Sequence, residues 1–457
     1  MADVIAALST PAGGAVGVIR ISGADALAVA GEVFRPVSGL DFADCPPRKL
    51  VLGDLVADGR VIDRPLAAAF PGDKTFTGEP MAEFHCHGSA AVLEAALLAL
   101  FRVGARQARP GEFTRRAFLN GKMDLFAAEA VADLVSARTP AAAANAVRQM
   151  GGAMSGELAA LRAGLVALCG HFLAVIDYPD EEIEDLPLDE IRSTIQRTDD
   201  RLHELLATFE RGRMLTEGVP CALIGRPNAG KSTLLNAMVG HERAIVTEIA
   251  GTTRDTIEET VRAGDLLLRL SDTAGLRDTA DPVEQIGVAR AKEAAAVAAA
   301  GGVVLALFDG NEPLCAEDEQ VLAACADAPR KIAVITKSDL LPTADLSMLD
   351  GHFDRVLTIS ARTGEGMEQL YKALNDLLLG GGLPEDGGLI TNVRQAGALT
   401  EAAACTGRAR AALDLGLTPD AVLADIEGAI AALGELDGAT VRDDIIDHIF
   451  ANFCVGK

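Results

Sequence analysis

Gly225-Arg-Pro-Asn-Ala-Gly-Lys-Ser232 identifies the type of one domain of this chain. It matches the phosphate-loop pattern GxxxxGK[ST]; the apolar run Val219 to Ile224 leads into it, and Thr233 begins a helix. Backbone N–H groups of such a loop and of the helix N-terminus suit an anionic phosphate chain. We expect Lys231 to neutralise β- and γ-phosphate charge and the Ser232 hydroxyl to ligate Mg²⁺. The stretch therefore predicts a nucleotide-binding α/β domain.

The residues around this loop, 219 to 378, alternate apolar strands with amphipathic helices. The expected strands are Val219 to Ile224, Leu266 to Leu270, Val303 to Phe308, Ile332 to Ile335 and Val356 to Ile359. Such alternation favours βαβ units and a mostly parallel sheet, the architecture of a Ras-like P-loop G domain.

Further motifs follow the phosphate loop in the order of a GTP switch. Asp272-Thr-Ala-Gly275 ends a strand, where a carboxylate can reach Mg²⁺ through water and the Gly275 N–H can approach the γ-phosphate. Gly251-Thr-Thr-Arg-Asp255 lies between loop and strand. We expect its Thr253 to reach Mg²⁺ only when the γ-phosphate is present.

Guanine recognition is predicted at Thr336-Lys337-Ser338-Asp339, with Ser360-Ala-Arg362 behind the base. Asp339 can accept hydrogen bonds from guanine N1–H and N2, whereas adenine would leave the carboxylate unpaired at a cost of roughly 1–3 kcal/mol. GTPases usually carry Asn where this chain has Thr336. A Thr hydroxyl can bridge loops but lacks the amide's second hydrogen-bonding arm, so we expect specificity through Asp339 with somewhat weaker affinity.

The hydrolytic group is not obvious from the motif itself. Leu276 stands where Ras-like proteins place a water-orienting Gln, and an apolar side chain cannot orient water. Asp278, Asp281 and Glu284 are the nearest downstream carboxylates, and a helix-capping role is equally open for each of them.

The rest of the chain predicts two further domains. Residues 1–120 mix short apolar runs (Val16 to Ile21, Val51 to Val56, Leu66 to Phe70) with a helix over Ala90 to Val103, which favours an N-terminal α+β domain. Residues 121–215 and 380–457 are helical in pattern. We therefore expect one discontinuous helical domain, with the G domain, 216–379, inserted into it.

Composition narrows the function classes. The 457 residues carry a net charge of −25, so any RNA contact must be local or supplied by a partner. No stretch of 18 or more uncharged apolar residues occurs, which argues against membrane insertion. The eight cysteines form no CxxC pair, so we expect neither a zinc site nor disulfides. Scattered single cysteines fit a protein of the reduced cytosol.

The whole chain resembles the MnmE (TrmE) family of tRNA-modification GTPases. The motifs that carry the resemblance are the phosphate loop, Ala244 to Asp255, Asp272 to Arg277, Phe76-Thr-Gly-Glu79, Arg109 to Lys122, Asp177 to Glu182 and Phe453-Cys-Val-Gly-Lys457. The resemblance implies that the N-terminal domain binds a reduced folate, 5,10-methylene- or 5-formyl-tetrahydrofolate, as one-carbon donor. The matching positions are Arg20, Glu83, Lys122 and Lys457.

The resemblance also assigns the nucleotide site. It implies K⁺ at Asn228, Thr247, Ile249 and Thr252, Mg²⁺ at Ser232 and Thr253, and Glu284 as the catalytic, water-orienting acid. The residues expected to contact GTP are Asn228, Ala229, Gly230, Lys231, Ser232, Thr233, Thr247, Glu248, Ile249, Ala250, Gly251, Thr252, Thr253, Asp272, Thr273, Ala274, Gly275, Thr336, Lys337, Ser338, Asp339, Ser360, Ala361 and Arg362.

The implied activity is a K⁺-activated GTPase of the cytoplasm that acts as a homodimer. In a heterotetramer with the FAD-dependent partner MnmG it would install a carboxymethylaminomethyl or aminomethyl group at C5 of the wobble uridine, position 34, of certain tRNAs, which it meets through the complex. Two alternatives remain open, a GTPase switch in ribosome assembly without folate chemistry and a folate-dependent transferase acting alone. The resemblance implies no metal at His85-Cys86-His87, although strand alternation puts both imidazoles on one face.

Overall fold

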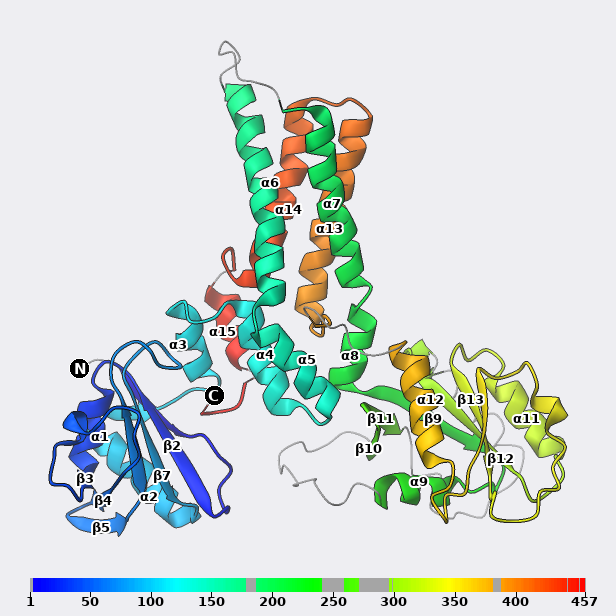
Figure 1. Ribbon diagram of the computed structural model, residues 1–457, viewed down its shortest axis with the longest axis horizontal. Helices are drawn as coiled ribbons and strands as arrows, with labels where there is room; N and C mark the ends of the chain where they lie inside the picture. The colour runs from blue at the N-terminus through cyan, green and yellow to red at the C-terminus, as the bar shows by residue number, and fades with distance from the viewer. Residues whose placement is uncertain are drawn as a thin grey trace. The chain divides into compact units, whose positions relative to one another are not determined.

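The computed structural model describes residues 3–177, 186–240, 259–270, 296–297, 299–380, 388–441, 443–451 and 453–456. These residues belong to two compact units, Met1–Val135 with Gln149–Asp199 and Glu401–Lys457, and Ser136–Arg148 with Asp200–Thr400. Figure 1 shows the elements of each unit.

The N-terminal part of the first unit is a mostly antiparallel sheet covered by helices. Its strand order is β3-β4-β6-β7-β2-β1-β8, with β5 paired to β4, and among the described strands of this sheet only the β1–β8 pair is parallel. Helices α1 (Ala26–Val33) and α2 (Ala90–Arg102) share a buried core with the sheet. The strands are β1 (Val4–Leu8), β2 (Val16–Ser22), β3 (Phe34–Pro36), β4 (Val51–Ala57), β5 (Arg60–Asp63), β6 (Leu66–Phe70), β7 (Met81–His87) and β8 (Ala105–Gln107).

The second unit contains a sheet in the order β10-β11-β9-β12-β13-β14, parallel except for the β10–β11 pair. On β12, Val303, Leu305 and Leu307 face one buried core, and Val304, Ala306 and Phe308 face the other, because successive side chains of a strand alternate. The strands are β9 (Val219–Gly225), β10 (Glu259–Ala263), β11 (Leu266–Leu270), β12 (Val303–Asp309), β13 (Lys331–Thr336) and β14 (Arg355–Thr358). The predicted alternating α/β domain is confirmed, with β10 as an unpredicted edge strand.

Helices account for most of the remaining chain and confirm the expected fold class. They are α3 (Glu112–Leu119), α4 (Leu125–Ser136), α5 (Pro140–Met150), α6 (Ala153–Asp177), α7 (Leu188–Leu206), α8 (Phe209–Glu217), α9 (Lys231–Gly240), α11 (Ala316–Cys325), α12 (Met367–Leu379), α13 (Val393–Asp414), α14 (Pro419–Asp437) and α15 (Asp443–Ala451). On one face of α14, Val422, Ile426 and Leu433 are buried and Ile430 is half-buried.

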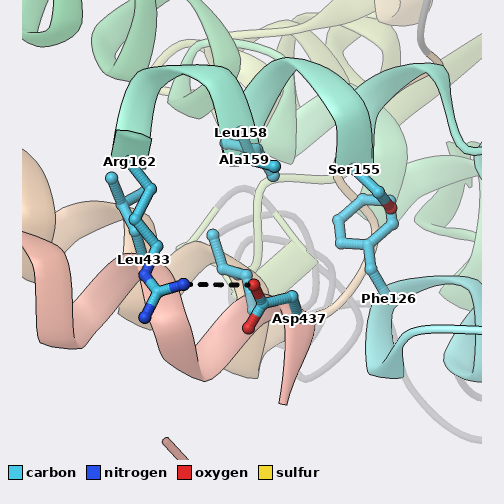
Figure 2. A pocket seen from close by; sticks show the side chains of 8 residues that line it. Phe126, Ser155, Leu158, Ala159, Arg162, Leu433 and Asp437 are labelled. Atoms are coloured by element: carbon cyan, nitrogen blue, oxygen red, sulfur yellow. Dashed lines mark ion pairs between the residues drawn. The ribbon is translucent and has the colours of Figure 1, made fainter. Parts of the chain in front are cut away.

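Helices α6 and α14 pack side by side in the first unit (Figure 1). A cavity of about 10 Å³, room for about one water molecule, lies between them and α4. Figure 2 shows the side chains that line it. Arg162 Nη1 lies 3.9 Å from Asp437 Oδ2 at its edge. Within the described chain, Ser155 Oγ and Arg162 Nε are buried without a hydrogen-bond partner. A cavity of this size cannot hold a nucleotide or a folate.

One stretch of α6, Ala153–Val175, is long and apolar enough to cross a membrane by length and composition. A single stretch of this kind is weak support for a span, because a core helix of a water-soluble protein meets the same criterion. Leu158, Leu165 and Leu168 of this helix are buried inside the first unit.

Candidate functional site

The phosphate loop joins β9 to α9 in a conformation that only particular residues adopt. Asn228 has φ +61° and Gly230 has φ +95°, both left-handed. Gly is free there and Asn is among the few other residues that tolerate this region. Lys231 Nζ donates to the carbonyls of Gly225 at 2.6 Å and of Arg226 at 2.9 Å, so its ammonium lies over the loop. Ser232 and Thr233 are exposed in the first turn of α9, where a phosphate and its metal ion can be reached.

The base-reading segment begins at the end of β13 and contacts the phosphate loop. Thr336, only 2% exposed, lies with Oγ1 2.8 Å from the carbonyl oxygen of Ala229 and 3.1 Å from that of Phe308. The predicted bridging role of this hydroxyl is therefore confirmed. Lys337 has φ +64°, a second left-handed non-glycine residue in the nucleotide site.

Asp339 is exposed and held from behind by the segment after β14. Ser360 Oγ, which is buried, donates to Asp339 Oδ1 at 2.7 Å, and the Thr363 N–H donates to Ser360 Oγ at 3.2 Å. The hydrogen bond from Ser360 lowers the pKa of Asp339 below its usual value, and the charge of Arg362 lowers it further. The carboxylate is thus kept ionised and oriented, as an acceptor for two N–H groups must be.

A charged cluster behind this site was missed from the sequence. Asp309, 3% exposed at the end of β12, lies with Oδ2 2.5 Å from Lys337 Nζ and 3.9 Å from Arg226 Nη2. Arg226 also pairs with Glu312 at 2.7 Å and with buried Asp318 at 3.6 Å. One carboxylate therefore contacts both the phosphate loop and the base-reading segment. The available signal was an Asp directly after a fully apolar strand.

Several predicted nucleotide-site residues lie outside the described residues. They are Thr247, Glu248, Ile249, Ala250, Gly251, Thr252, Thr253, Asp272, Thr273, Ala274, Gly275 and Glu284. Their roles stay predictions.

The predicted one-carbon site begins with a cross-strand pair. Arg20 on β2 is directly opposite Glu83 on β7, and Arg20 Nε donates to Glu83 Oε1 at 3.0 Å. The guanidinium carbon lies 5.6 Å from the ring centroid of Phe76 and 5.9 Å from that of Phe113. The side chains of Arg20 and Glu83 are 21% and 19% exposed. They are shielded but still reachable.

Lys122 lies against the 76–79 loop. A Cβ at Gly78 would come within 2.9 Å of Lys122 Cε, and Asn120 Nδ2 donates to the Thr77 carbonyl at 2.7 Å. Lys122 Nζ is 4.0 Å from exposed Asp73. The structure thus puts Arg20 and Lys122 against the same loop, with Phe76 as the residue of that loop beside Arg20.

A partly buried ion network anchors the 76–79 loop. Arg116 pairs with Glu79, Asp3 and Glu112 at 2.9, 2.9 and 3.3 Å, and Arg106 bridges Asp3 and Glu112. The hydrogen bonds from Arg106 lower the pKa of Asp3. Burial alone would raise the pKa of Glu112, but the Arg106 hydrogen bond and a backbone N–H outweigh it and the net shift is downward.

The C-terminal segment docks on the N-terminal sheet. Val455 forms a bridge with Pro110, the Gly111 N–H donates to the Cys454 carbonyl at 3.2 Å, and Ser9 Oγ donates to the Gly456 carbonyl at 3.0 Å. Gly456 has φ +92°, and a Cβ there would lie 2.3 Å from the Leu8 carbonyl oxygen. Leu8 ends β1, one residue after the partner of Arg20. Lys457 lies outside the described residues.

The two histidines of the His85-Cys86-His87 run each contact a carboxylate. His85 Nε2 is 3.6 Å from Glu83 Oε2, and His87 Nδ1 is 2.6 Å from Asp63 Oδ1. Burial raises the pKa of the Cys86 thiol to about 12, so it stays protonated at neutral pH.

Comparisons with known proteins agree across the chain. The family model "GTP-binding protein TrmE N-terminus" matches residues 4–122, and "MnmE helical domain" matches 125–454. The tRNA modification GTPases MnmE of Chloroflexus aurantiacus and Heliobacterium modesticaldum are 42% and 40% identical over 467 and 468 residues. The alignments cover 100% of this chain and 100% and 99% of the relatives.

Solved structures match part of the chain. One is Aquifex aeolicus Era bound to GDP and AlF4−, 23% identical over 41% of this chain and 66% of that chain, with a TM-score of 0.27. That score is too low to support an argument. The full-length relatives and the two family models, however, establish that the chain is a member of the MnmE (TrmE) family, a GTP hydrolase that acts in tRNA modification.

Proposed function

We propose that this GTPase is activated by K⁺ and, with an FAD-dependent MnmG partner, installs an aminomethyl or carboxymethylaminomethyl group at C5 of the tRNA wobble uridine in the cytoplasm, with a reduced folate as one-carbon donor. GTP and Mg²⁺ follow from family membership. Folate binding, activation by K⁺, the homodimer and the partnership with MnmG are our proposals.

The observation that carries the folate proposal is the docked tail. Gly456 lies at the end of β1, against Leu8 and Ser9, next to the strand position that pairs with Arg20. On this ground we propose that Lys457, the next residue in the sequence, contributes to a site around Arg20 and Glu83. Without this contact, nothing would relate Lys457 to residues more than 370 positions earlier in the sequence.

The side chains around Arg20 fit the chemistry of a folate. A folate has a flat pterin with an amide/amidine edge and a tail with two carboxylates. Glu83 can accept from the pterin edge, half-buried Phe76 offers aromatic surface, and Arg20 and Lys122 can hold carboxylates. The bound folate would supply the one-carbon unit, and these residues would bind and orient it.

The nucleotide roles proposed for the described residues follow from their positions. Asn228 would offer its side-chain oxygen to K⁺, Ser232 its hydroxyl to Mg²⁺, and Asp339 its carboxylate to guanine. Thr247, Ile249, Thr252 and Thr253 are proposed as further ion ligands, and Glu284 as the acid that orients water. The K⁺ site is proposed to form as two G domains of a homodimer meet, and tRNA is proposed to bind through the heterotetramer with MnmG.

Mass analysis of wobble uridine tests the whole proposal. Cells that lack this chain should lose the modified uridine, and re-expression should restore it. If the amount of modified wobble uridine does not change on deletion, a ribosome-assembly switch is favoured instead. Restoration in a strain that also lacks MnmG would favour a transferase that acts alone.

Folate binding is tested on the purified chain with 5-formyl-tetrahydrofolate. Glu83→Gln should weaken binding at least tenfold and leave GTP hydrolysis unchanged. Asp58→Asn is the matched control, because Asp58 also pairs with an arginine, Arg102, but is 73% exposed and belongs to the β4–β5 turn. Equal folate affinity in both variants would remove Glu83 from the site.

A further inference from the structure

The hydroxyl of Thr336 is already committed to the protein. It carries a single proton, whereas an Asn amide would carry two. Its two hydrogen-bond partners in the described part of the chain, the carbonyl oxygens of Ala229 at 2.8 Å and Phe308 at 3.1 Å, can only accept. The proton is therefore shared between these two carbonyls, and none remains to donate to a ligand.

The packing around Thr336 fixes this orientation. The side chain is 2% exposed, and a Cβ at Gly230 would lie 3.4 Å from its Cβ, Cγ2 and Oγ1 atoms. Thr336 therefore lies directly against the phosphate loop. Rotating the hydroxyl outward would break its bonds to two buried backbone carbonyls, which is costly when no water replaces them.

The next side chain in the segment is also directed inward. Lys337 Nζ contacts Asp309 Oδ2 at 2.5 Å, and Asp309 is 3% exposed. The first two side chains of the base-reading segment thus contact β12 and the phosphate loop. Asp339, which is exposed, is an acceptor only.

Guanine presents two different edges to a protein. N1–H and N2–H₂ are donors, whereas N7 and O6 are acceptors. An ionised Asp339 can read the donor edge. To read N7, the protein must supply a donor, and Thr336 has none left.

We propose that Thr336 is a positioning residue that ties the base-reading segment to the phosphate loop and leaves guanine N7 unread. Selectivity for guanine then depends on the donor edge and Asp339. The inference rests on the proposed role of Asp339 in base recognition. It predicts that this chain tolerates nucleotides altered at N7, such as 7-deazaguanosine phosphates, while it rejects those without the N2 amino group.

The test is calorimetric binding of GDP, 7-deaza-GDP and IDP to the full chain with Mg²⁺. Diphosphates avoid turnover during the measurement. The wild-type chain should bind 7-deaza-GDP within twofold of GDP and IDP at least tenfold more weakly. Thr336→Asn, which adds an amide donor, should gain about a fivefold preference for GDP over 7-deaza-GDP. A fivefold loss for 7-deaza-GDP in the wild-type chain would overturn the proposal.

Two further variants separate positioning from folding. Thr336→Ser keeps the hydroxyl and should match the wild-type chain with all three nucleotides. Thr336→Val removes it and should weaken GDP, 7-deaza-GDP and IDP by the same factor, about tenfold, with an unchanged circular dichroism spectrum. Unchanged affinity in Thr336→Val would overturn the positioning role. Equal affinity of the wild-type chain for IDP and GDP would instead overturn the base-reading role of Asp339, which distinguishes the two failures.

Discussion

The ammonium of Lys337 and the carboxylate of Asp309 form a 2.5 Å ion pair at the end of β12, with Arg226 of the phosphate loop 3.9 Å from the same oxygen. The two ends of the candidate nucleotide site therefore share one buried anion. Asp309 also accepts the Asn311 N–H at 3.0 Å, which fixes its other oxygen.

Neutralising this anion should loosen both ends of the site. For Asp309→Asn we expect the KM for GTP to rise about tenfold or more with kcat little changed, because ground-state and transition-state binding are lost together. Glu312→Gln is the control, since within the described ranges Glu312 pairs with Arg226 and is 58% exposed. Steady-state kinetics that show a fall in kcat at unchanged KM would contradict the shared-anion role.

Asn228 allows its side chain and its backbone to be tested separately. At φ +61°, glycine fits without strain, whereas Ala would cost roughly 1–2 kcal/mol. Asn228→Gly should therefore leave the melting temperature unchanged and abolish the stimulation of GTP hydrolysis by K⁺ over Na⁺. Asn228→Ala should have a lower melting temperature and should also lose the stimulation by K⁺. Retained K⁺ stimulation in Asn228→Gly would remove the side chain from the ion site.

Gly111 controls the docking of the tail. It has φ +63°, and a Cβ there would lie 2.6 Å from the Phe450 carbonyl oxygen and 2.8 Å from Phe453 Cβ. Gly111→Ala should displace the tail, so that folate binding and tRNA modification fall while GTP hydrolysis continues. Gly121→Ala is a matched control, with φ +67° and nothing within 4 Å of its added Cβ. If both variants bind folate equally, tail docking is not required.

The Asp3–Arg106–Glu112 network predicts an acid sensitivity. Both carboxyl pKa values are lowered in the folded chain, so their contribution to stability is present above the unfolded pKa and is lost as pH falls through the folded value. The melting temperature of the first unit should therefore drop between about pH 5 and pH 2. Glu112→Gln should have a lower melting temperature than the wild-type chain at neutral pH. Its melting temperature should also fall less than that of the wild-type chain on acidification. Glu94→Gln, an exposed change, should follow the wild-type curve.

The sequence predicted local features well. The phosphate loop, five strands of the α/β sheet and the Thr336 bridge follow from short patterns whose chemistry is contained within a few residues. Strand β10 was missed because Glu259–Ala263 is a polar edge strand without an apolar run. Spacing could not give the Arg226–Glu312 contact, whose partners are 86 residues apart, or the pairing of Arg20 with Glu83, which depends on the β2–β7 register. Only the family resemblance indicated Arg20 and Glu83.

The hydrogen bond between Ser9 and Gly456 joins positions 447 residues apart. During translation, the N-terminal strands emerge long before the segment that binds to them, and the whole nucleotide-binding domain is synthesised in between. Contacts of such separation form late in folding, after the loop-closure entropy has been overcome. A chain that ends before residue 454 therefore lacks this contact even when its phosphate loop has already folded. Truncation thus separates the ability to hydrolyse GTP from the assembly of the tail on the first strand.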